Sequence, residues 1–158
     1  LAGEPFKHMT QVDMLHVPYK GGAAALNDLI AGQIQLSFYN MAPGLPHVRA
    51  GRLRGIAVTG EGRSPAAPEF PTVIESGVPG FVVMGWWGVF GPKATPAAIA
   101  GKLAEEILRI FQSEPTRQQL IAQTYEPASR QREAFRKHIE QEIVKWARVI
   151  EVSGARAD

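Results

Sequence analysis

Two short segments of the sequence combine residue types that can bind a small anion. In the first, Tyr19, Lys20 and Gly21 follow a short apolar run and precede a helical pattern. Backbone N–H groups at the start of a helix attract anions, and a lysine beside them adds positive charge. The lysine precedes the glycines and no Ser or Thr follows, so the segment is neither a P-loop nor a dinucleotide-binding fingerprint. The alternative interpretation is an ordinary glycine turn with a solvated lysine.

The second segment consists of Tyr39, Asn40 and Met41, and it also lies between a strand pattern and a helical pattern. Ligands of open α/β sheets bind at the carboxyl ends of the strands. We therefore expect both segments to line one crevice. The alternative interpretation is that Asn40 only caps the following helix and Tyr39 is half-buried.

Residue types that support catalysis or metal binding form no recognisable set. The sequence contains no cysteine, which excludes disulfides, thiolate metal sites and cysteine nucleophiles. The four histidines lack metal-ligand spacing: His8, His16, His47 and His138. Neither Gly-x-Ser-x-Gly nor His-Glu-x-x-His occurs. We therefore predict no catalytic residue, no metal and no cofactor, with a small α/β enzyme of unrecognised site as an alternative.

The bulk composition is that of an ordinary globular chain. Its 158 residues are enough for one compact domain, and 45% of them are hydrophobic. The net charge of +2 is small and the basic residues are scattered, which argues against nucleic acid as a partner. The first residue is leucine, so we expect a processed or fragmentary chain.

The order of expected elements favours an α/β fold with a mostly parallel sheet flanked by helices. Alternating or β-branched apolar runs predict strands at 14–17, 34–38, 53–59, 82–90 and 125–127. Helical periodicity predicts helices over 1–10, 23–31 and 41–50 and a helix after Pro115. It also predicts a helix that is capped by Thr95 and begins at Pro96, and a last helix that is capped by Ser129. We expect Gly32, Gly51 and Gly154 to end helices, and the proline-rich stretch 60–80 to be a surface loop.

Several separated motifs resemble one family. They are HVPYKGG at 16–22, ALNDL at 25–29, LPHVRAG at 45–51, LRGIAVT at 53–59 and FPTVIESG at 70–77. Their sequence and order are similar to the Bug-type solute-binding proteins of tripartite tricarboxylate transporters. The resemblance covers nearly the whole chain.

The resemblance implies a type II periplasmic-binding-protein fold, in which two α/β lobes close on a ligand. Family members are about twice this length, so we expect an incomplete clamshell that lacks most of the N-terminal lobe. Residues 1–55 would belong to the second lobe, and residues 56–158 to the hinge return and the C-terminal part of the first lobe. Uncovered surface of this kind predicts a homodimer or strand exchange.

The resemblance also implies a function. The chain would be a periplasmic subunit that captures a dicarboxylate, tricarboxylate or acidic amino acid and passes it to membrane permease subunits. The expected ligand-binding residues are Tyr19, Lys20, Gly21, Tyr39, Asn40 and Met41. Many relatives carry aspartate at the position of Tyr39, so the tyrosine would either alter the ligand preference or abolish the usual site. A sensory module that presents its ligand to a signalling partner is the alternative.

Overall fold

The computed structural model describes residues 1–126 and 132–153, and these form two compact units. The first unit comprises Leu1–Gly85, and the second begins at Trp86. The lobe boundary expected near residue 55 stays a prediction. No helix in the described part of the chain is long and apolar enough to cross a lipid bilayer.

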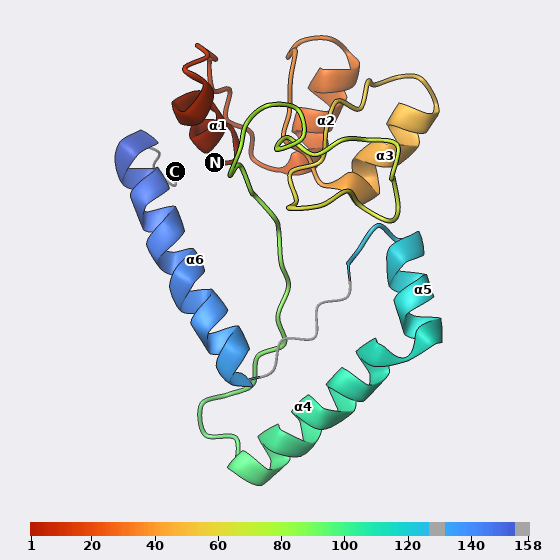
Figure 1. Cartoon of the computed structure of the whole chain (residues 1–158), viewed down its shortest axis with the longest axis vertical. Coiled ribbons are helices and arrows are strands. Elements are labelled where there is room, and N and C mark those ends of the chain that lie inside the picture. The colour runs from red at the N-terminus through yellow and green to blue at the C-terminus, as the bar shows by residue number, and fades with distance from the viewer. Residues whose placement is uncertain (127–131, 154–158) are drawn as a thin grey trace. The chain divides into compact units, whose positions relative to one another are not determined.

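The first unit contains the three helices expected in this half of the chain (Figure 1). They are α1 (Gly3–Thr10), α2 (Gly22–Ile30) and α3 (Met41–Arg49). Pro5 lies in the first turn of α1, where a missing N–H removes no helical hydrogen bond. The helical periodicity of the sequence is therefore confirmed in this unit.

Glycine ends α2 and α3 in the same way. Gly32 has φ of 74° and Gly51 has φ of 70°, each one residue beyond the helix cap. After α2, the N–H groups of Gly32 and Gln33 donate to the carbonyls of Leu29 and Asp28 at 3.2 and 2.8 Å. This is a Schellman motif, which satisfies carbonyls that a helix end otherwise leaves unpaired. Both glycines were expected to end these helices.

Three phenylalanine rings form the centre of the first unit. Phe81 is 1% exposed, and its ring lies 5.7 Å from the ring of Phe6 and 6.0 Å from that of Phe38. The rings of Phe6 and Phe38 are 5.6 Å apart. Burial of such rings is the main stabilising term available to a small unit, and it joins α1 to two segments distant in sequence.

The stretch 60–80 is not a pure surface loop, and that prediction is wrong in part. Its buried residues are Ser64, Ala67, Thr72 and Val73. Thr72 and Glu75 form a reciprocal capping box: the Thr72 N–H donates to the Glu75 carboxylate at 2.7 Å, and the Glu75 N–H donates to the Thr72 hydroxyl at 2.9 Å. Arg63 donates to the same carboxylate at 3.0 Å. The stretch contains many prolines and glycines, as a loop does, but hydrogen bonds within it hold part of it in a compact turn with buried residues.

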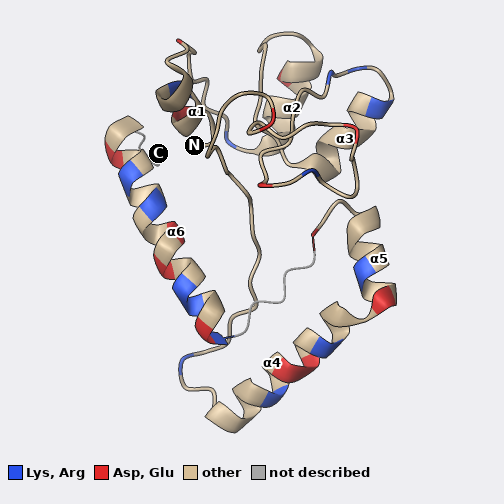
Figure 2. Ribbon diagram, viewed as in Figure 1, with Lys and Arg blue, Asp and Glu red and all other residues tan. Residues whose placement is uncertain are grey.

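The second unit contains α4 (Ala97–Gln112), α5 (Glu114–Ala122) and α6 (Arg132–Ser153). Pro96 occupies the cap position of α4 with ψ of 137°, so the expectation that it is the first helical residue is off by one. Lys and Arg alternate with Asp and Glu along α6 (Figure 2), where Arg136 pairs with Glu133 and Glu140. The caps expected at Ser129 and Gly154 lie outside the described residues.

The expected sheet is not confirmed within the described residues. Their β-structure is an isolated parallel bridge between Val58 and Thr72. Residues 14–17 and 82–90 form no strand, and residues 34–38 form a bend followed by irregular backbone. The expected strand at 125–127 falls partly outside the described residues. Sequence alternation marks which side chains share a face, but a strand also needs a neighbour about 4.8 Å away, which a pattern does not supply.

Candidate functional site

The structure brings the two predicted segments into contact through the ring of Tyr39. A Cβ atom placed on Gly22, the first residue of α2, would lie 3.1 Å from the Tyr39 hydroxyl oxygen. One placed on Gly44 in α3 would lie 3.5 Å from Cδ1 of the same ring. Tyr39 is thus half-buried between the start of α2 and the start of α3. Tyr39 and the residues at these two helix starts, 19–22 and 40–44, form the Tyr39 cluster.

Neither helix start in this cluster is closed by a side chain. Gly21 occupies the cap position of α2 and has no side chain to offer. Asn40 occupies the cap position of α3, but its side chain makes no capping hydrogen bond, so the capping role considered for it is wrong. Each helix start therefore presents N–H groups that no capping side chain occupies, next to exposed backbone.

Tyr19 is held against α2 by its hydroxyl group. The hydroxyl donates to Oδ2 of Asp28 at 2.8 Å. This hydrogen bond, together with burial and the negative charge of Asp28, raises the pKa of Tyr19. Because its only proton is directed to Asp28, the Tyr19 oxygen can accept a further hydrogen bond but cannot donate one to an anion. Tyr19 therefore acts on this cluster by positioning the turn before α2.

The other predicted residues differ in accessibility. Lys20 and Gly21 are exposed beside the start of α2, and Asn40 is exposed beside the start of α3. Met41 is partly covered as the first residue of α3. Lys20 makes no ion pair with any other residue in the described part of the chain, so its charge is available to solvent or to a bound anion.

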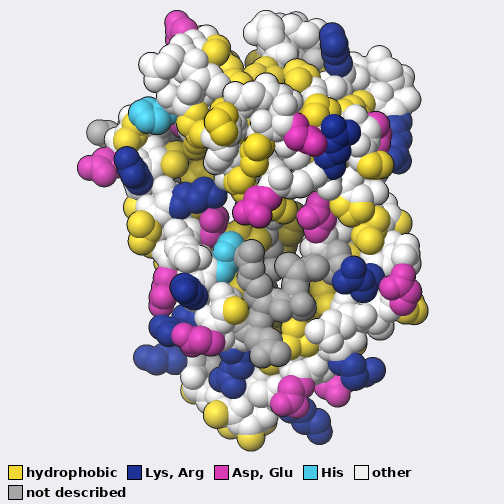
Figure 3. All heavy atoms as spheres, viewed as in Figure 1, with side chains coloured by type: hydrophobic (Ala, Val, Ile, Leu, Met, Phe, Trp, Pro, Cys, Tyr) yellow, Lys and Arg dark blue, Asp and Glu magenta, His cyan; other side chains and the backbone are white. Residues whose placement is uncertain are grey.

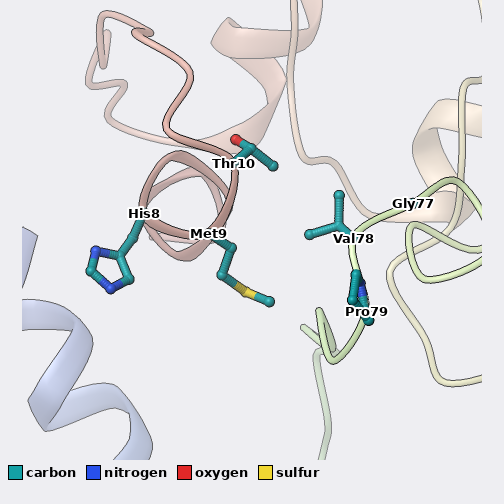
Figure 4. A pocket seen from close by; sticks show the side chains of 6 residues that line it. All are labelled: His8, Met9, Thr10, Gly77, Val78 and Pro79. Carbon is teal, nitrogen blue, oxygen red and sulfur yellow. The ribbon is translucent and has the colours of Figure 1, made fainter.

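A separate cavity of about 540 Å³ lies between the end of α1 and a turn of the stretch 60–80 (Figure 4). Its lining is His8, Met9, Thr10, Gly77, Val78 and Pro79. The Thr10 hydroxyl donates to the Phe6 carbonyl at 2.7 Å, so its proton is already used. None of the predicted site residues lines this cavity, and no sequence signal pointed to it.

No cluster of three or more metal-ligating side chains occurs among the described residues. The chemistry of the Tyr39 cluster is accordingly that of hydrogen-bond donors, one exposed lysine and two helix starts. Such a set can hold an anionic group by hydrogen bonds and charge without changing its covalent structure.

Solved structures with a similar fold define the class as periplasmic binding proteins. The Rhodopseudomonas palustris protein Rpa4515 with adipate matches with a TM-score of 0.87 and 34% identity, over 97% of this chain and 51% of its own. The periplasmic binding protein BugD matches with a TM-score of 0.76 and 28% identity, over 99% of this chain and 53% of its own. MatC of Rhodopseudomonas palustris, with bound malate, matches with a TM-score of 0.77 and 27% identity, over 94% of this chain and 52% of its own.

The chain belongs to the tripartite tricarboxylate transporter receptor family, whose sequence model matches residues 1–155. Protein BugT of Bordetella pertussis is 34% identical over 99% of this chain and 48% of its own length. The chain thus spans about half the length of the relatives it matches. The resemblance seen in the sequence is confirmed. The members of this family are receptors, so the prediction that the chain is not an enzyme is confirmed.

Proposed function

We propose that the chain is part of the extracytoplasmic solute-binding subunit of a tripartite tricarboxylate transporter and that it binds a small carboxylate. The observation that carries this proposal is the match of the receptor family over residues 1–155. Two solved relatives hold adipate and malate, both of which are dicarboxylates. A dicarboxylate is therefore the first ligand to test, before tricarboxylates and acidic amino acids.

In this proposal the Tyr39 cluster holds one carboxylate group. Backbone N–H groups at Gly21 and at the start of α3 donate to the carboxylate oxygens, beside the side chains of Asn40 and Met41. The exposed ammonium group of Lys20 adds favourable charge. The Tyr39 hydroxyl, which lies against Gly22, can donate one further hydrogen bond. Tyr19 positions the turn through Asp28 and does not donate to the ligand.

The proposal extends to the architecture of the binding cycle. Residues 1–55 belong to the second lobe, and 53–59 run through the hinge toward the first lobe, which takes the remaining residues 56–158. Closure of the lobes on the carboxylate creates the form that docks on the membrane permease subunits. The subunit works in the periplasm, as two of the similar solved proteins are described as periplasmic. No observation on this chain favours the sensory alternative.

The test is ligand-induced stabilisation of the full gene product that contains these residues. Adipate, malate, citrate and glutamate are compared with the uncharged diamide of adipate by thermal unfolding and calorimetry. A ligand at 100 times its Kd raises the stability by about 2.7 kcal/mol, whereas the diamide has no effect. Stabilisation by the uncharged diamide alone would move the assignment away from carboxylates. A flat response to all of these compounds would remove the proposed function.

A further inference from the structure

The Tyr39 cluster contains no carboxylate side chain. Residues 19–22 and 39–44 include neither aspartate nor glutamate, and the sequence has none between Asp28 and Glu61. The charged side chain of the cluster is that of Lys20, which forms no ion pair within the described part of the chain. The two helix starts add partial positive charge. The charges of the cluster therefore favour an anion and disfavour a cation.

The acidic residue that contacts the cluster is Asp28, and its carboxylate lies away from the helix starts. Oδ2 of Asp28 accepts the hydrogen bond from the Tyr19 hydroxyl at 2.8 Å. Asp28 is six residues beyond Gly22, the first residue of α2, which is about 9 Å along the helix axis at a rise of about 1.5 Å per residue. An ion pair needs its two charged atoms within about 4 Å of each other. Asp28 is therefore too distant to pair with a cation held at the start of α2.

Two neutral side chains supply oxygen atoms to the cluster. The Tyr39 hydroxyl makes no hydrogen bond with another described residue, and the Asn40 side chain makes no capping hydrogen bond. Each of these groups can donate or accept a hydrogen bond, so either can satisfy a hydroxyl group of a ligand. An ammonium group can also donate to them, but a neutral oxygen does not offset its charge. A buried charge without an opposite partner is strongly unfavourable.

We infer that the Tyr39 cluster selects dicarboxylates that carry hydrogen or hydroxyl on the carbon next to a carboxylate and rejects those that carry an ammonium group there, an inference that rests on the proposed function. That carbon is bonded directly to the carboxylate, so a carboxylate held at the helix starts brings its substituent into the cluster. In a four-carbon dicarboxylate the substituted carbon is no more than two bonds from either carboxylate carbon. The substituent therefore lies near the cluster whichever end of the ligand is held.

The test compares succinate, L-malate and L-aspartate as ligands of the full gene product that contains these residues. The three acids share one four-carbon skeleton and carry hydrogen, hydroxyl and ammonium at the same carbon. By calorimetry, malate is expected to bind within about tenfold of succinate, because its hydroxyl finds neutral partners. Aspartate is expected to bind at least about a hundredfold more weakly than succinate, because its ammonium group loses water without gaining a carboxylate partner. If only longer acids bind, glutarate with glutamate or adipate with 2-aminoadipate takes their place.

Variants that add a carboxylate assign the discrimination to this cluster. Tyr39→Asp places a carboxylate there, whereas Tyr39→Asn removes the same ring and adds no charge. The ratio of aspartate affinity to succinate affinity is expected to be about tenfold or more higher in Tyr39→Asp, because the new carboxylate attracts the ammonium and repels the dicarboxylate. Asn40→Asp makes the same change of charge without a change of size at an exposed position, with the unchanged protein as its control. It decides the matter if the loss of the Tyr39 ring prevents folding.

The results separate this inference from the proposed function. Aspartate binding as tightly as succinate overturns the inference and leaves the carboxylate function in place. A ratio of aspartate to succinate affinity that rises in neither Tyr39→Asp nor Asn40→Asp also overturns it, since the discrimination then comes from residues outside the cluster. Binding of none of these acids removes the proposed function, and the inference with it.

Discussion

At the scale of single residues, Tyr39 and Gly22 constrain each other. The Tyr39 hydroxyl would be 3.1 Å from a Cβ at position 22, and two further atoms of the ring would be within 3.5 Å. Contacts this short force one of the two groups to move. The glycine at the first position of α2 is therefore needed for the present placement of the tyrosine, as well as for the exposure of the helix start.

A double-mutant cycle tests this constraint. Alanine normally stabilises a helix relative to glycine by up to about 1 kcal/mol. In the otherwise unchanged chain, Gly22→Ala should lose that gain through the contact with Tyr39. In a Tyr39→Ala background the gain should return, giving a coupling free energy of about 1 kcal/mol by urea unfolding. Gly101→Ala is the matched control, because a Cβ there meets nothing within 4 Å. Equal effects of Gly22→Ala in both backgrounds would contradict the constraint.

The positive charge of Lys20 is expected to strengthen carboxylate binding at the same cluster. Lys20→Met should weaken carboxylate binding about two- to fivefold at low ionic strength, the range of an exposed charge pair. The difference should vanish near 0.5 M salt, where charges are screened within about 4–5 Å. Calorimetry at two salt concentrations measures both effects. Lys93→Met, an exposed lysine of the second unit, is the control. An unchanged affinity at low salt would remove Lys20 from the proposed site.

Sequence reasoning located this cluster only in part. The change from strand to helical periodicity placed Tyr39, Asn40 and Gly21 at helix starts, and the structure agrees. The hydrogen bond from Tyr19 to Asp28 was not foreseen, because it spans nine residues across a turn and depends on loop conformation. The absence of a capping hydrogen bond at Asn40 was also not foreseen. An asparagine at this position is able to cap a helix, but the residue type alone does not show that the hydrogen bond forms.

At the scale of elements, helix α5 is followed by a threonine in the left-handed conformation, where α2 and α3 are followed by glycine. Thr124 follows its cap with φ of 65°, and the N–H groups of Thr124 and Tyr125 donate to Ile121 and Leu120 at 2.8 Å. This is the hydrogen-bond pattern that Gly51 provides after α3. A β-branched residue is strained in this left-handed conformation, whereas glycine is not.

Thr124→Gly should therefore stabilise the second unit by about 0.5–1 kcal/mol, the relief of strain less the larger chain entropy of unfolded glycine. The reciprocal control is Gly51→Ala, which should destabilise by about 1 kcal/mol. Nothing lies within 4 Å of a Cβ at Gly51, so its loss would be purely conformational. Urea unfolding of both variants measures the changes. A destabilising Thr124→Gly would indicate that the threonine side chain makes a compensating contact.

The stretch 60–80 gives the first unit a defined acid sensitivity. The hydrogen bond from the Thr72 N–H, and then those from Arg63 with its charge, lower the pKa of Glu75 below its ordinary value of 4.5. The unfolded chain then binds a proton at a higher pH than the folded chain does. The stabilisation by the Glu75 carboxylate is complete above the ordinary pKa and is lost as the pH falls through the lowered one.

Glu75→Gln should consequently lower the melting temperature at pH 6 and flatten its decline between pH 4.5 and pH 3. Melting curves at a series of pH values measure both changes. Glu61→Gln is the control, since Glu61 makes no side-chain hydrogen bond or ion pair with another residue in the described ranges. Parallel pH profiles for Glu75→Gln and the unchanged chain would show that Glu75 does not contribute to the acid sensitivity.

Helices were predictable from the sequence and the sheet was not confirmed. The helices α2 and α3 combine apolar periodicity with a terminal glycine, and both signals are local. The expected strand at 82–90 shows the contrast: Trp86 contacts Phe135 and Trp87 contacts Tyr125, but a strand also needs a neighbouring strand, which a local pattern does not supply. The bridge between Val58 and Thr72 likewise depends on the path of residues 60–71, which brings Thr72 beside Val58.

At the scale of the whole molecule, burial is uneven between the units. All residues that are buried in the described ranges belong to the first unit, including Leu26, Leu45 and Phe81. In the second unit, Ile99 and Leu103 of α4 are 54% and 55% exposed. Figure 3 shows hydrophobic side chains scattered over the visible face. A fully buried large apolar side chain contributes about 1.5–3 kcal/mol, so the first unit holds most of this stabilisation.

Phe81→Ala tests whether the cluster of Phe6, Phe38 and Phe81 provides most of the stability of the first unit. Removal of a buried phenyl ring between Phe6 and Phe38 should lower the free energy of unfolding of this unit by about 3–5 kcal/mol. Native-state hydrogen exchange at the amides of α2 measures the loss directly. Leu15→Ala is the control, because Leu15 is 91% exposed and its truncation should change stability by less than about 0.5 kcal/mol. If both variants changed α2 exchange equally, the stability of this unit would have to come from contacts outside the aromatic cluster.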